Sequence, residues 1–336
     1  MAIDAATEGM SSMRAIDAKD FAAEALTGIW CAALMPFEPG SLAVDEAGFR
    51  ANLKHWFGDL GIDGVFVAGK QGEFFAMSVA ERKRAFEVAV DVARAQGKRT
   101  IMSVSDQNMD TVVELARHAE AVGADFIVVH APLLHFVHDR DEILFEYYRH
   151  IAAQVNIGIC LWSHPDSGYL MSPELCARIA DIPNIVGIKY SVPREMYVRL
   201  TDLTRGKLIV STASEEEWLD NILDLGWRCY LCSSPPYLLQ TASDRRMRDY
   251  TDLAFAGRGD EARALWESLQ PVRHALRSTR PGGKPQSHQK YWQSLLGQVG
   301  GAVRRPMLEL TEAEQQATRA AFDACGLNKP MREAAE

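Results

Sequence analysis

A single lysine, Lys189, stands near the end of the apolar, β-rich segment Ile185–Tyr190. A strand of this composition is buried on both faces, so the ammonium group is expected to point into the space that the sheet surrounds. Desolvation there lowers the pKa of an amine, and a neutral amine can attack a carbonyl carbon to form a Schiff base. The alternative is a side chain that reaches solvent or pairs with a carboxylate. The strand alone favours this alternative, but the rest of the chain favours Schiff-base chemistry.

Polar side chains also follow nearly all of the remaining apolar, β-rich segments. They occur in the runs at residues 35–37, 69–73, 105–106, 130–132, 163–165, 212–215 and 233–236. In a barrel of parallel strands, the residues at the carboxyl ends of the strands gather around one mouth. The sequence therefore predicts a polar site that faces Lys189.

These residues need a frame of alternating strands and helices. Strands are expected at residues 29–34, 64–68, 100–104, 126–130, 158–162, 185–190, 208–211 and 229–232. The segments between them have helical spacing, as in residues 79–95, where Ser78 and Glu81 form a capping box. Strict alternation indicates a parallel sheet, and the number of strands favours an α/β fold of the closed (β/α)8 TIM barrel type. An open doubly wound sheet is the alternative, but no glycine-rich phosphate turn follows the first strand.

The alternation ends near residue 257. Only helices are expected beyond it, at residues 260–276, 286–296 and 312–325. We therefore divide the chain into an N-terminal extension (1–26), the barrel (27–257) and a C-terminal helical extension (258–336).

The composition is that of an ordinary globular protein, with 47% hydrophobic and 24% charged residues. A net charge of −9 argues against a general affinity for nucleic acid or anionic membranes. No apolar run is long enough to span a membrane. Residues 1–26 carry several acidic residues and lack the apolar core of a secretory signal, so a cytoplasmic location is expected.

The cysteines give no sign of a metal or redox site. Cys229 and Cys232 form a CxxC motif, but this motif falls within an expected strand. Residues three apart on a strand face opposite sides, which suits neither a disulfide nor a shared metal ion. No metal site is therefore expected.

In their order and spacing, these motifs resemble the dihydrodipicolinate synthase/N-acetylneuraminate lyase superfamily. The resemblance covers residues 28–255 and rests on the segments 33–37, 69–73, 78–82, 123–125, 165 and 187–189. It implies a TIM barrel with C-terminal helices that assembles as a homodimer or homotetramer. It also implies action on a small-molecule 2-oxo acid without a metal or an organic cofactor, with Lys189 as the residue that forms the imine.

Three positions of the family's proton relay are replaced. The tyrosine expected at the end of the fifth strand is Trp162, whose indole N–H cannot act as an acid or base near neutral pH. The tyrosine that synthases carry after the fourth strand falls in residues 130–134, which contain no hydroxyl group, and their arginine beyond Pro165 is Ser167. The chain is therefore not expected to be a standard dihydrodipicolinate synthase.

Histidine is the obvious substitute for the missing tyrosines, because it titrates near neutrality. His130 ends the fourth strand, and His164 lies two residues beyond Trp162. We predict catalytic or substrate-contacting roles for these two residues. His135 and His138, in the loop after the fourth strand, are interpreted as residues without a catalytic role.

Lys70 and Gln71 replace two hydroxyl-bearing residues of the family's glycine-rich loop. Lys70 is predicted to hold a carboxylate or to lower the pKa of Lys189 by charge repulsion. Glu73 is assigned a structural role, as in the family. The residues predicted to bind substrate are Lys70, Gln71, Gly72, Trp162, Ser163, Tyr190 and Ser233.

The first hypothesis is a carbon–carbon or carbon–oxygen lyase, an aldolase or a dehydratase, that acts on a 2-oxo acid through a Lys189 imine. Aromatic residues near the mouth and a loose similarity to hydratase-aldolases suggest a bulky or aromatic substrate. The second hypothesis is a hydrolase or deaminase of a cyclic or aromatic metabolite, and the third is a non-catalytic ligand-binding barrel. The retained lysine favours the first hypothesis over the third.

Overall fold

The computed structural model describes residues 18–134, 136–231 and 236–327. Eight strands form one sheet in the order β7-β6-β5-β4-β3-β2-β1-β8, and every paired neighbour is parallel. They are β1 (Gly28–Ala32), β2 (Gly64–Val67), β3 (Arg99–Ser103), β4 (Phe126–His130), β5 (Gly158–Ser163), β6 (Ile185–Tyr190), β7 (Ile209–Ser211) and β8 (Cys229–Leu231). Each expected strand is therefore present at its predicted place.

A serine side chain closes the seam between β7 and β8. The hydroxyl group of Ser211 donates to the carbonyl oxygen of Cys229 (2.9 Å) and accepts from the amide of Leu231 (2.8 Å). One hydroxyl thus satisfies backbone groups that would otherwise stand at a sheet edge. The sheet curls into a barrel, which confirms the predicted fold and rules out the open doubly wound sheet.

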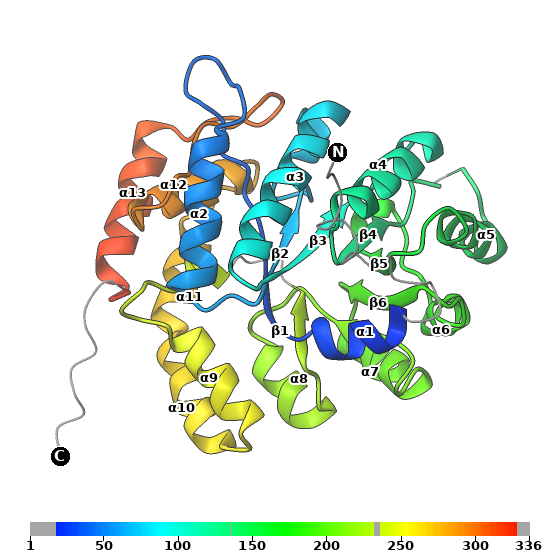
Figure 1. Cartoon of the computed structure of the whole chain (residues 1–336). Coiled ribbons are helices and arrows are strands. Elements are labelled where there is room, and N and C mark those ends of the chain that lie inside the picture. The colour runs from blue at the N-terminus through cyan, green and yellow to red at the C-terminus, as the bar shows by residue number, and fades with distance from the viewer. Residues whose placement is uncertain (1–17, 135, 232–235, 328–336) are drawn as a thin grey trace, which may run out of the picture.

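Helices alternate with the strands and surround the barrel (Figure 1). The capping box that was predicted at Ser78 and Glu81 is present at the start of α3. Within the described residues, three single-turn 3₁₀ helices lie in the loops, namely η2 (Phe74–Ala76), η3 (Pro165–Ser167) and η4 (Pro236–Leu238). The helices of this part are α1 (Ala18–Ala25), α2 (Glu46–Gly58), α3 (Val79–Ala95), α4 (Met109–Val122), α5 (Asp141–Ala152), α6 (Pro173–Ile179), α7 (Arg194–Leu203), α8 (Trp218–Leu225) and α9 (Arg246–Phe255).

The C-terminal segment is helical, as predicted, but two helices stand where one was expected. It contains α10 (Gly259–Ser268), α11 (Gln270–Ser278), α12 (Pro285–Leu295) and α13 (Glu312–Ala324). The single helix expected at residues 260–276 is wrong, because the chain breaks at Leu269. Pro271 stands in the first turn of α11, and a proline ring has no amide hydrogen and collides with the carbonyl group one turn earlier.

Helix α1 packs against β5 and β6 at the N-terminal side of the barrel (Figure 1). Its Phe21 ring lies 5.3 Å from the ring of Phe126, the first residue of β4. The absence of a side chain at Gly187 is required here, since a Cβ atom would lie 3.0 Å from Cys160 Sγ and 3.1 Å from Leu26. These contacts fill the end of the barrel at which the strands begin. A functional site is therefore expected at the opposite end, where the strands finish.

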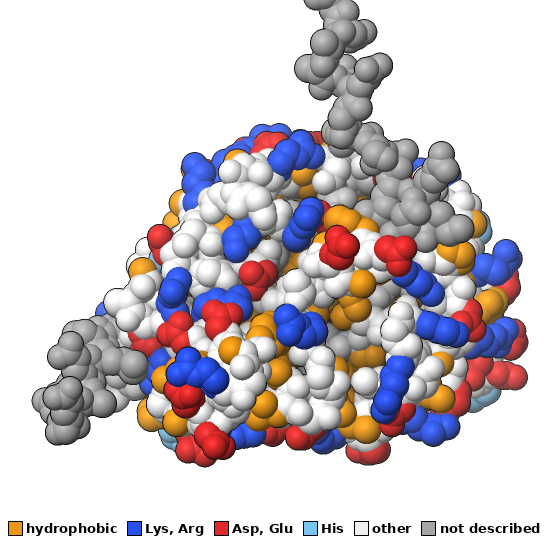
Figure 2. Space-filling view, turned by 60° about the horizontal axis from the view of Figure 1, so that its bottom comes forward, with side chains coloured by type: hydrophobic (Ala, Val, Ile, Leu, Met, Phe, Trp, Pro, Cys, Tyr) orange, Lys and Arg blue, Asp and Glu red, His pale blue; other side chains and the backbone are white. Residues whose placement is uncertain are grey.

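Charge is mixed on the face that Figure 2 shows, where basic and acidic side chains are interspersed. Among the described residues, no helix is both long enough and apolar enough to cross a lipid bilayer.

Candidate active site

Lys189 lies inside the barrel, with only 3% of its surface exposed. Its Nζ atom is 4.7 Å from the centre of the Trp162 ring and 5.2 Å from the centre of the Phe66 ring. A small cavity of about 10 Å³ adjoins it and is lined by Phe66, Ile101, Val128, Lys189 and Leu231. The strand therefore delivers the amine to the interior, as its apolar sequence predicts.

The register of β5 and β6 explains why Lys189 and Trp162 are neighbours and why the next residues are not. Trp162 pairs with Lys189, and Ser163 pairs with Tyr190. Successive side chains on a strand point to opposite faces, so the second pair lies outside the barrel. There the Tyr190 hydroxyl donates to the carbonyl oxygen of Met171 (2.5 Å), whose amide donates to Ser163 Oγ (3.1 Å). Ser163 and Tyr190, both predicted to bind substrate, are therefore not brought to Lys189.

Three charged or titratable side chains meet at the mouth, and we call Lys70, His164 and Asp166 the mouth triad. Lys70, in the loop after β2, forms an ion pair with Asp166 of η3. Lys70 Nζ also lies 3.2 Å from His164 Nδ1, and Nδ1 accepts a hydrogen bond from the backbone amide of Asp166 (3.2 Å). Lys70 Nζ is 5.0 Å from the centre of the Trp162 ring. Two lysines thus contact the same indole, and His164 stands beside them.

The electrostatics of the mouth favour neutral histidines. Burial and then the positive charge of Lys70 lower the pKa of His164, although Asp166 opposes this shift. Burial and then Lys70 also lower the pKa of His130, to about 4. Burial lowers the pKa of Lys70 itself against the opposing effect of Asp166. Both imidazoles are therefore uncharged near pH 7.

His130 and Trp162 each carry a buried nitrogen that is available to a ligand. Their rings meet edge to face with centres 4.6 Å apart. His130 Nε2 and Trp162 Nε1 are buried and make no hydrogen bond within the part of the chain that the structure describes. Buried polar groups are normally satisfied, so these two atoms point to a partner that binds in the mouth.

The loop that carries Lys70, Gln71 and Gly72 is held by the C-terminal segment. Fully buried Glu73 forms an ion pair with Lys290 of α12 (2.5 Å) and accepts from the backbone amide of Arg304 (2.9 Å). Gly72 lets the loop pack closely on the end of β1, because a Cβ atom there would lie 3.1 Å from the carbonyl oxygen of Ala33. Glu73 therefore has the structural role that was predicted.

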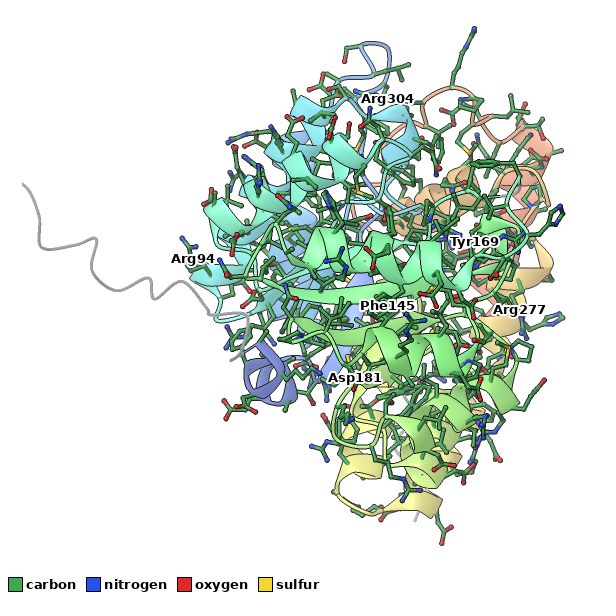
Figure 3. All side chains as sticks on the ribbon, turned by 90° about the vertical axis from the view of Figure 1, so that its right-hand side faces the viewer. Arg94, Phe145, Tyr169, Asp181, Arg277 and Arg304 are labelled. Carbon is green, nitrogen blue, oxygen red and sulfur yellow. The ribbon has the colours of Figure 1, made fainter. Side chains whose placement is uncertain are left out.

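Arg304 adds a second link between the C-terminal segment and the barrel. Its guanidinium group donates to the carbonyl oxygens of Leu42 and Ala76 and forms an ion pair with Glu81 (2.7 Å). Figure 3 shows it near the loop between β1 and α2. Sequence reasoning missed this contact, because a residue after the barrel gives no local signal of which loop it will hold.

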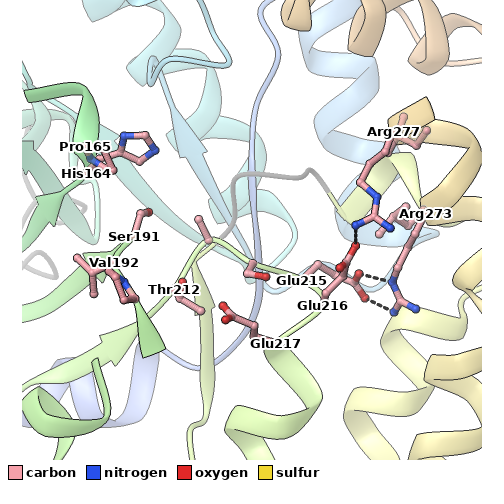
Figure 4. Close-up of a pocket in the computed structure, with 15 residues that line it drawn as sticks. His164, Pro165, Ser191, Val192, Thr212, Glu215, Glu216, Glu217, Arg273 and Arg277 are labelled. Atoms are coloured by element: carbon pink, nitrogen blue, oxygen red, sulfur yellow. Dashed lines mark hydrogen bonds and ion pairs between the residues drawn. The ribbon is translucent and has the colours of Figure 1, made fainter. Parts of the chain in front are cut away.

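A cleft of about 520 Å³ opens beside the mouth triad (Figure 4). His164 and Pro165 form one wall, and Arg273 and Arg277 of α11 form the other. Between them lie hydroxyl and carboxylate side chains, namely those of Ser191, Thr212, Ser214, Glu215, Glu216 and Glu217. Ser233, predicted to bind substrate after β8, lies outside the described residues.

A buried ion pair holds the far wall of the cleft together. Arg273 binds Glu215 through two nitrogens (2.6 and 2.7 Å), and both side chains are 3% exposed. The Tyr250 hydroxyl donates to the same carboxylate (2.7 Å). Arg277 pairs with Glu216 nearer to solvent. Among the residues described, no three His, Cys, Asp or Glu side chains converge as a metal site would require.

Comparison with known proteins identifies the family. Residues 25–325 match the model of the dihydrodipicolinate synthetase family. The chain belongs to this family. Its members are class I lyases that act through a Schiff base, and the chain is an enzyme of that class.

Relatives of several activities match the chain. A 4-hydroxy-tetrahydrodipicolinate synthase of Brucella abortus is 28% identical and covers 86% of this chain and 94% of its own length. A probable 5-dehydro-4-deoxyglucarate dehydratase of a Bradyrhizobium species is 26% identical and covers 95% of this chain and 98% of its own length. An N-acetylneuraminate lyase of Clostridium perfringens is 34% identical but covers only 49% of this chain and 57% of its own length.

Solved structures agree on the fold. A dihydrodipicolinate synthase family protein from Escherichia coli K12, solved in complex with pyruvate, superposes with a TM-score of 0.77. It is 22% identical and covers 90% of this chain and 99% of its own. At that identity the likeness concerns the barrel architecture alone.

Proposed function

We propose that the enzyme cleaves or dehydrates a 2-oxo acid through an imine on Lys189. The observation that carries this proposal is the position of Lys189 Nζ, buried between the rings of Trp162 and Phe66 at the end of β6. Ser191, two residues further along, already lines the 520 Å³ cleft. Lys189 lines the small cavity beside Phe66 and not the cleft itself. We therefore place the carbonyl group of the substrate at the end of the cleft nearest to Ser191, next to the buried amine.

The chemistry follows from the electron demand of the imine. The Lys189 amine adds to C2 of the 2-oxo acid, and loss of water gives a protonated imine. That cation draws electrons from C3, so either the C3–C4 bond breaks or a C3 proton and then a C4 hydroxyl group leave. Retro-aldol cleavage and dehydration thus share one intermediate. The proposed roles are Lys189 as the nucleophile and electron sink, and His164 or His130 as the group that moves protons.

The carboxylate of the substrate needs donors, and the mouth offers several. Gln71 and Gly72 lie in the loop beside β1, and Trp162 Nε1 is a buried donor without a partner within the described residues. Lys70 is engaged by Asp166. We therefore assign the carboxylate to Gln71, Gly72 and the indole N–H.

The cleft favours a hydroxylated substrate. Its lining holds hydroxyl groups, carboxylates and arginines, and Ser191 Oγ is buried without a hydrogen bond within the described residues. Two aromatic side chains near the mouth do not line this cleft, since Phe136 is 71% exposed and Phe75 lines a neighbouring cavity of about 300 Å³ that His130 also lines. Polar side chains in a cleft can form hydrogen bonds with the hydroxyl groups of a substrate. An aromatic ring bound there would leave the same side chains without hydrogen-bond partners, which is costly. We thus propose a hydroxylated 2-oxo acid in place of the aromatic one expected from the sequence.

Two further relations support this choice. The Bradyrhizobium relative named as a sugar-acid dehydratase covers nearly the whole chain. The phenol of the standard relay is replaced by Trp162, which supports an enzyme other than a standard dihydrodipicolinate synthase. Assembly as a homodimer or homotetramer and a cytoplasmic location stay predictions.

A substrate panel tests the proposal. We expect turnover of five- and six-carbon hydroxylated 2-oxo acids, at a kcat/KM at least about 10²-fold above that for arylidene-pyruvates, because unpaired polar groups reject the aromatic tail. Product formation is followed by mass spectrometry, with pyruvate and aspartate semialdehyde as a separate pair for the synthase reaction. A preference for the aromatic compounds would contradict the assignment of the cleft. Hydrolysis or deamination without release of an aldehyde or water would contradict the lyase chemistry.

A further inference from the structure

We propose that Lys70 and His164 form a proton relay that replaces the missing phenol, with Asp166 holding both residues in position. This inference rests on the proposed imine at Lys189. The relay would carry protons between Lys70 and the substrate through the two ring nitrogens of His164. His164 is then the group that contacts the reacting atoms, and Lys70 and Asp166 are positioning residues that act through it.

The geometry at His164 Nδ1 suits the first state of the relay. The Lys70 ammonium group lies 3.2 Å from Nδ1, and the backbone amide of Asp166 also donates to Nδ1 (3.2 Å). A nitrogen that accepts from two donors carries a lone pair, so the proton of the neutral ring is on Nε2. Nε2 makes no hydrogen bond within the described residues, and the ring lines the cleft. The Nε2 proton is therefore available to a bound substrate.

The same site also suits the second state, in which the proton has moved to Nδ1. The Asp166 carboxylate lies 3.0 Å from Nδ1 through Oδ1, while its other oxygen, Oδ2, binds Lys70. A proton on Nδ1 thus meets an acceptor without any movement of the ring. Both tautomers of neutral His164 are matched by groups already in place, which is what a two-way relay requires.

In the forward direction the relay assists loss of water. The carbinolamine C2–O bond breaks, and the Lys189 nitrogen lone pair forms the C=N double bond. The departing oxygen takes the Nε2 proton of His164, and Nδ1 takes a proton from the Lys70 ammonium group. The products are water, a protonated imine and a neutral Lys70, so the total charge is unchanged.

In the reverse direction the relay removes the proton whose loss starts dehydration or retro-aldol cleavage. Nε2 of His164 now has a lone pair and faces the substrate. It can take the C3 proton for dehydration or the C4 hydroxyl proton for retro-aldol cleavage, while the Nδ1 proton returns to Lys70. The two steps together restore the starting state without an outside base.

The charges around His164 agree with this assignment. The groups that face it are Lys70, Asp166, Lys189 and His130, and burial together with Lys70 lowers its pKa. Burial also lowers the pKa of Lys70, which makes its ammonium group a better proton donor than a solvated lysine. The His164 ring therefore stays neutral, and the Lys70 ammonium group beside it can release a proton readily.

The substitution Lys70→Arg separates a relay from a fixed charge. Arginine keeps the positive charge and the ion pair with Asp166, but its pKa is too high for it to release a proton. We expect both Lys70→Arg and Lys70→Met to slow imine formation with pyruvate by about 10²-fold or more, and His164→Gln to do the same. The matched control Lys207→Arg alters an exposed lysine that also pairs with an aspartate, Asp181, and should leave the rate unchanged.

Imine formation is measured by quenching mixtures of enzyme and pyruvate with borohydride at timed intervals and counting adducts by intact mass. The relay predicts a slow rate but a full final yield of adduct on Lys189 in each variant. A rate for Lys70→Arg within about threefold of the wild type would overturn the relay and make Lys70 a fixed charge. A raised KM with an unchanged maximal rate in Lys70→Met would overturn it too, and would assign Lys70 to the carboxylate. No adduct in the wild-type enzyme would instead contradict the proposed function.

The pH dependence gives an independent readout. Removing the charge of Lys70 in Lys70→Met should raise the pKa of His164, and removing that of Asp166 in Asp166→Asn should lower it further. NMR titration of the imidazole measures both, with His164→Gln to assign the signal. Opposite shifts are expected from direct contact. Equal shifts, or none, would show that the mouth triad does not control His164.

Discussion

Lys189→Ala is expected to lower kcat/KM by at least about 10⁴-fold, whichever 2-oxo acid proves to be the substrate. Without the amine no imine forms, and the enzyme loses the electron sink on which both cleavage and dehydration depend. Nearby groups cannot substitute. Lys70 is held by Asp166, with its Nζ atom 5.0 Å from the centre of the Trp162 ring. The loss should therefore appear in kcat, with substrate binding changed far less.

The control for this prediction is Lys207→Ala, which removes an exposed lysine at a surface ion pair. It should retain full activity. Thermal unfolding of Lys189→Ala should stay cooperative, because shortening this side chain leaves the barrel strands paired. Activity of a folded Lys189→Ala variant within about tenfold of the wild type would exclude imine catalysis at this residue.

Lys290→Met is expected to destabilise the protein by about 3–5 kcal/mol, which is the usual effect of removing one partner from a buried ion pair. Glu73 is fully buried and Lys290 is 2% exposed, with their charged atoms 2.5 Å apart. Among the described residues, the variant leaves the Glu73 carboxylate with the backbone amide of Arg304 as its one remaining hydrogen-bond partner. Urea unfolding gives the change in free energy. Activity should fall as well, because Glu73 fixes the loop that carries Gln71.

Two variants sharpen this test. Lys284→Met removes a lysine whose partner, Glu314, is far more exposed (side chains 15% and 29% exposed), and should change stability by less than about 1 kcal/mol. The double variant Glu73→Gln/Lys290→Met should recover part of the loss, since it removes the uncompensated charge. If Lys290→Met proves no more destabilising than Lys284→Met, the buried pair does not hold the loop.

The fold could be predicted because its signals are local. Eight apolar runs at regular intervals, separated by helical spacing, indicate a TIM barrel before any contact is known. Two features had no comparable signal. The closure of the barrel depends on the Ser211 hydroxyl, which meets β8 twenty residues later. The break at Leu269 precedes Pro271, but the residues on both sides keep one helical pattern that gives no sign of an interruption.

The site shows the same division between local and distant effects. Lys189 and Trp162 share one face of the sheet, as the strand pattern and register require. The prediction that Ser163 and Tyr190 also bind substrate conflicts with the period of two along a strand, which directs both side chains to the outer face of the sheet. Asp166 was missed, since its partner Lys70 lies 96 residues away. Ion pairs across a barrel mouth depend on loop geometry that one sequence does not express.

The most direct test of the central claim is borohydride reduction of the enzyme in the presence of pyruvate, followed by intact mass and peptide mapping. The account predicts one reduced pyruvate adduct per chain, located on Lys189 and absent from Lys189→Ala. An unmodified chain, or an adduct that maps to Lys70 or to surface lysines with Lys189 intact, would contradict it.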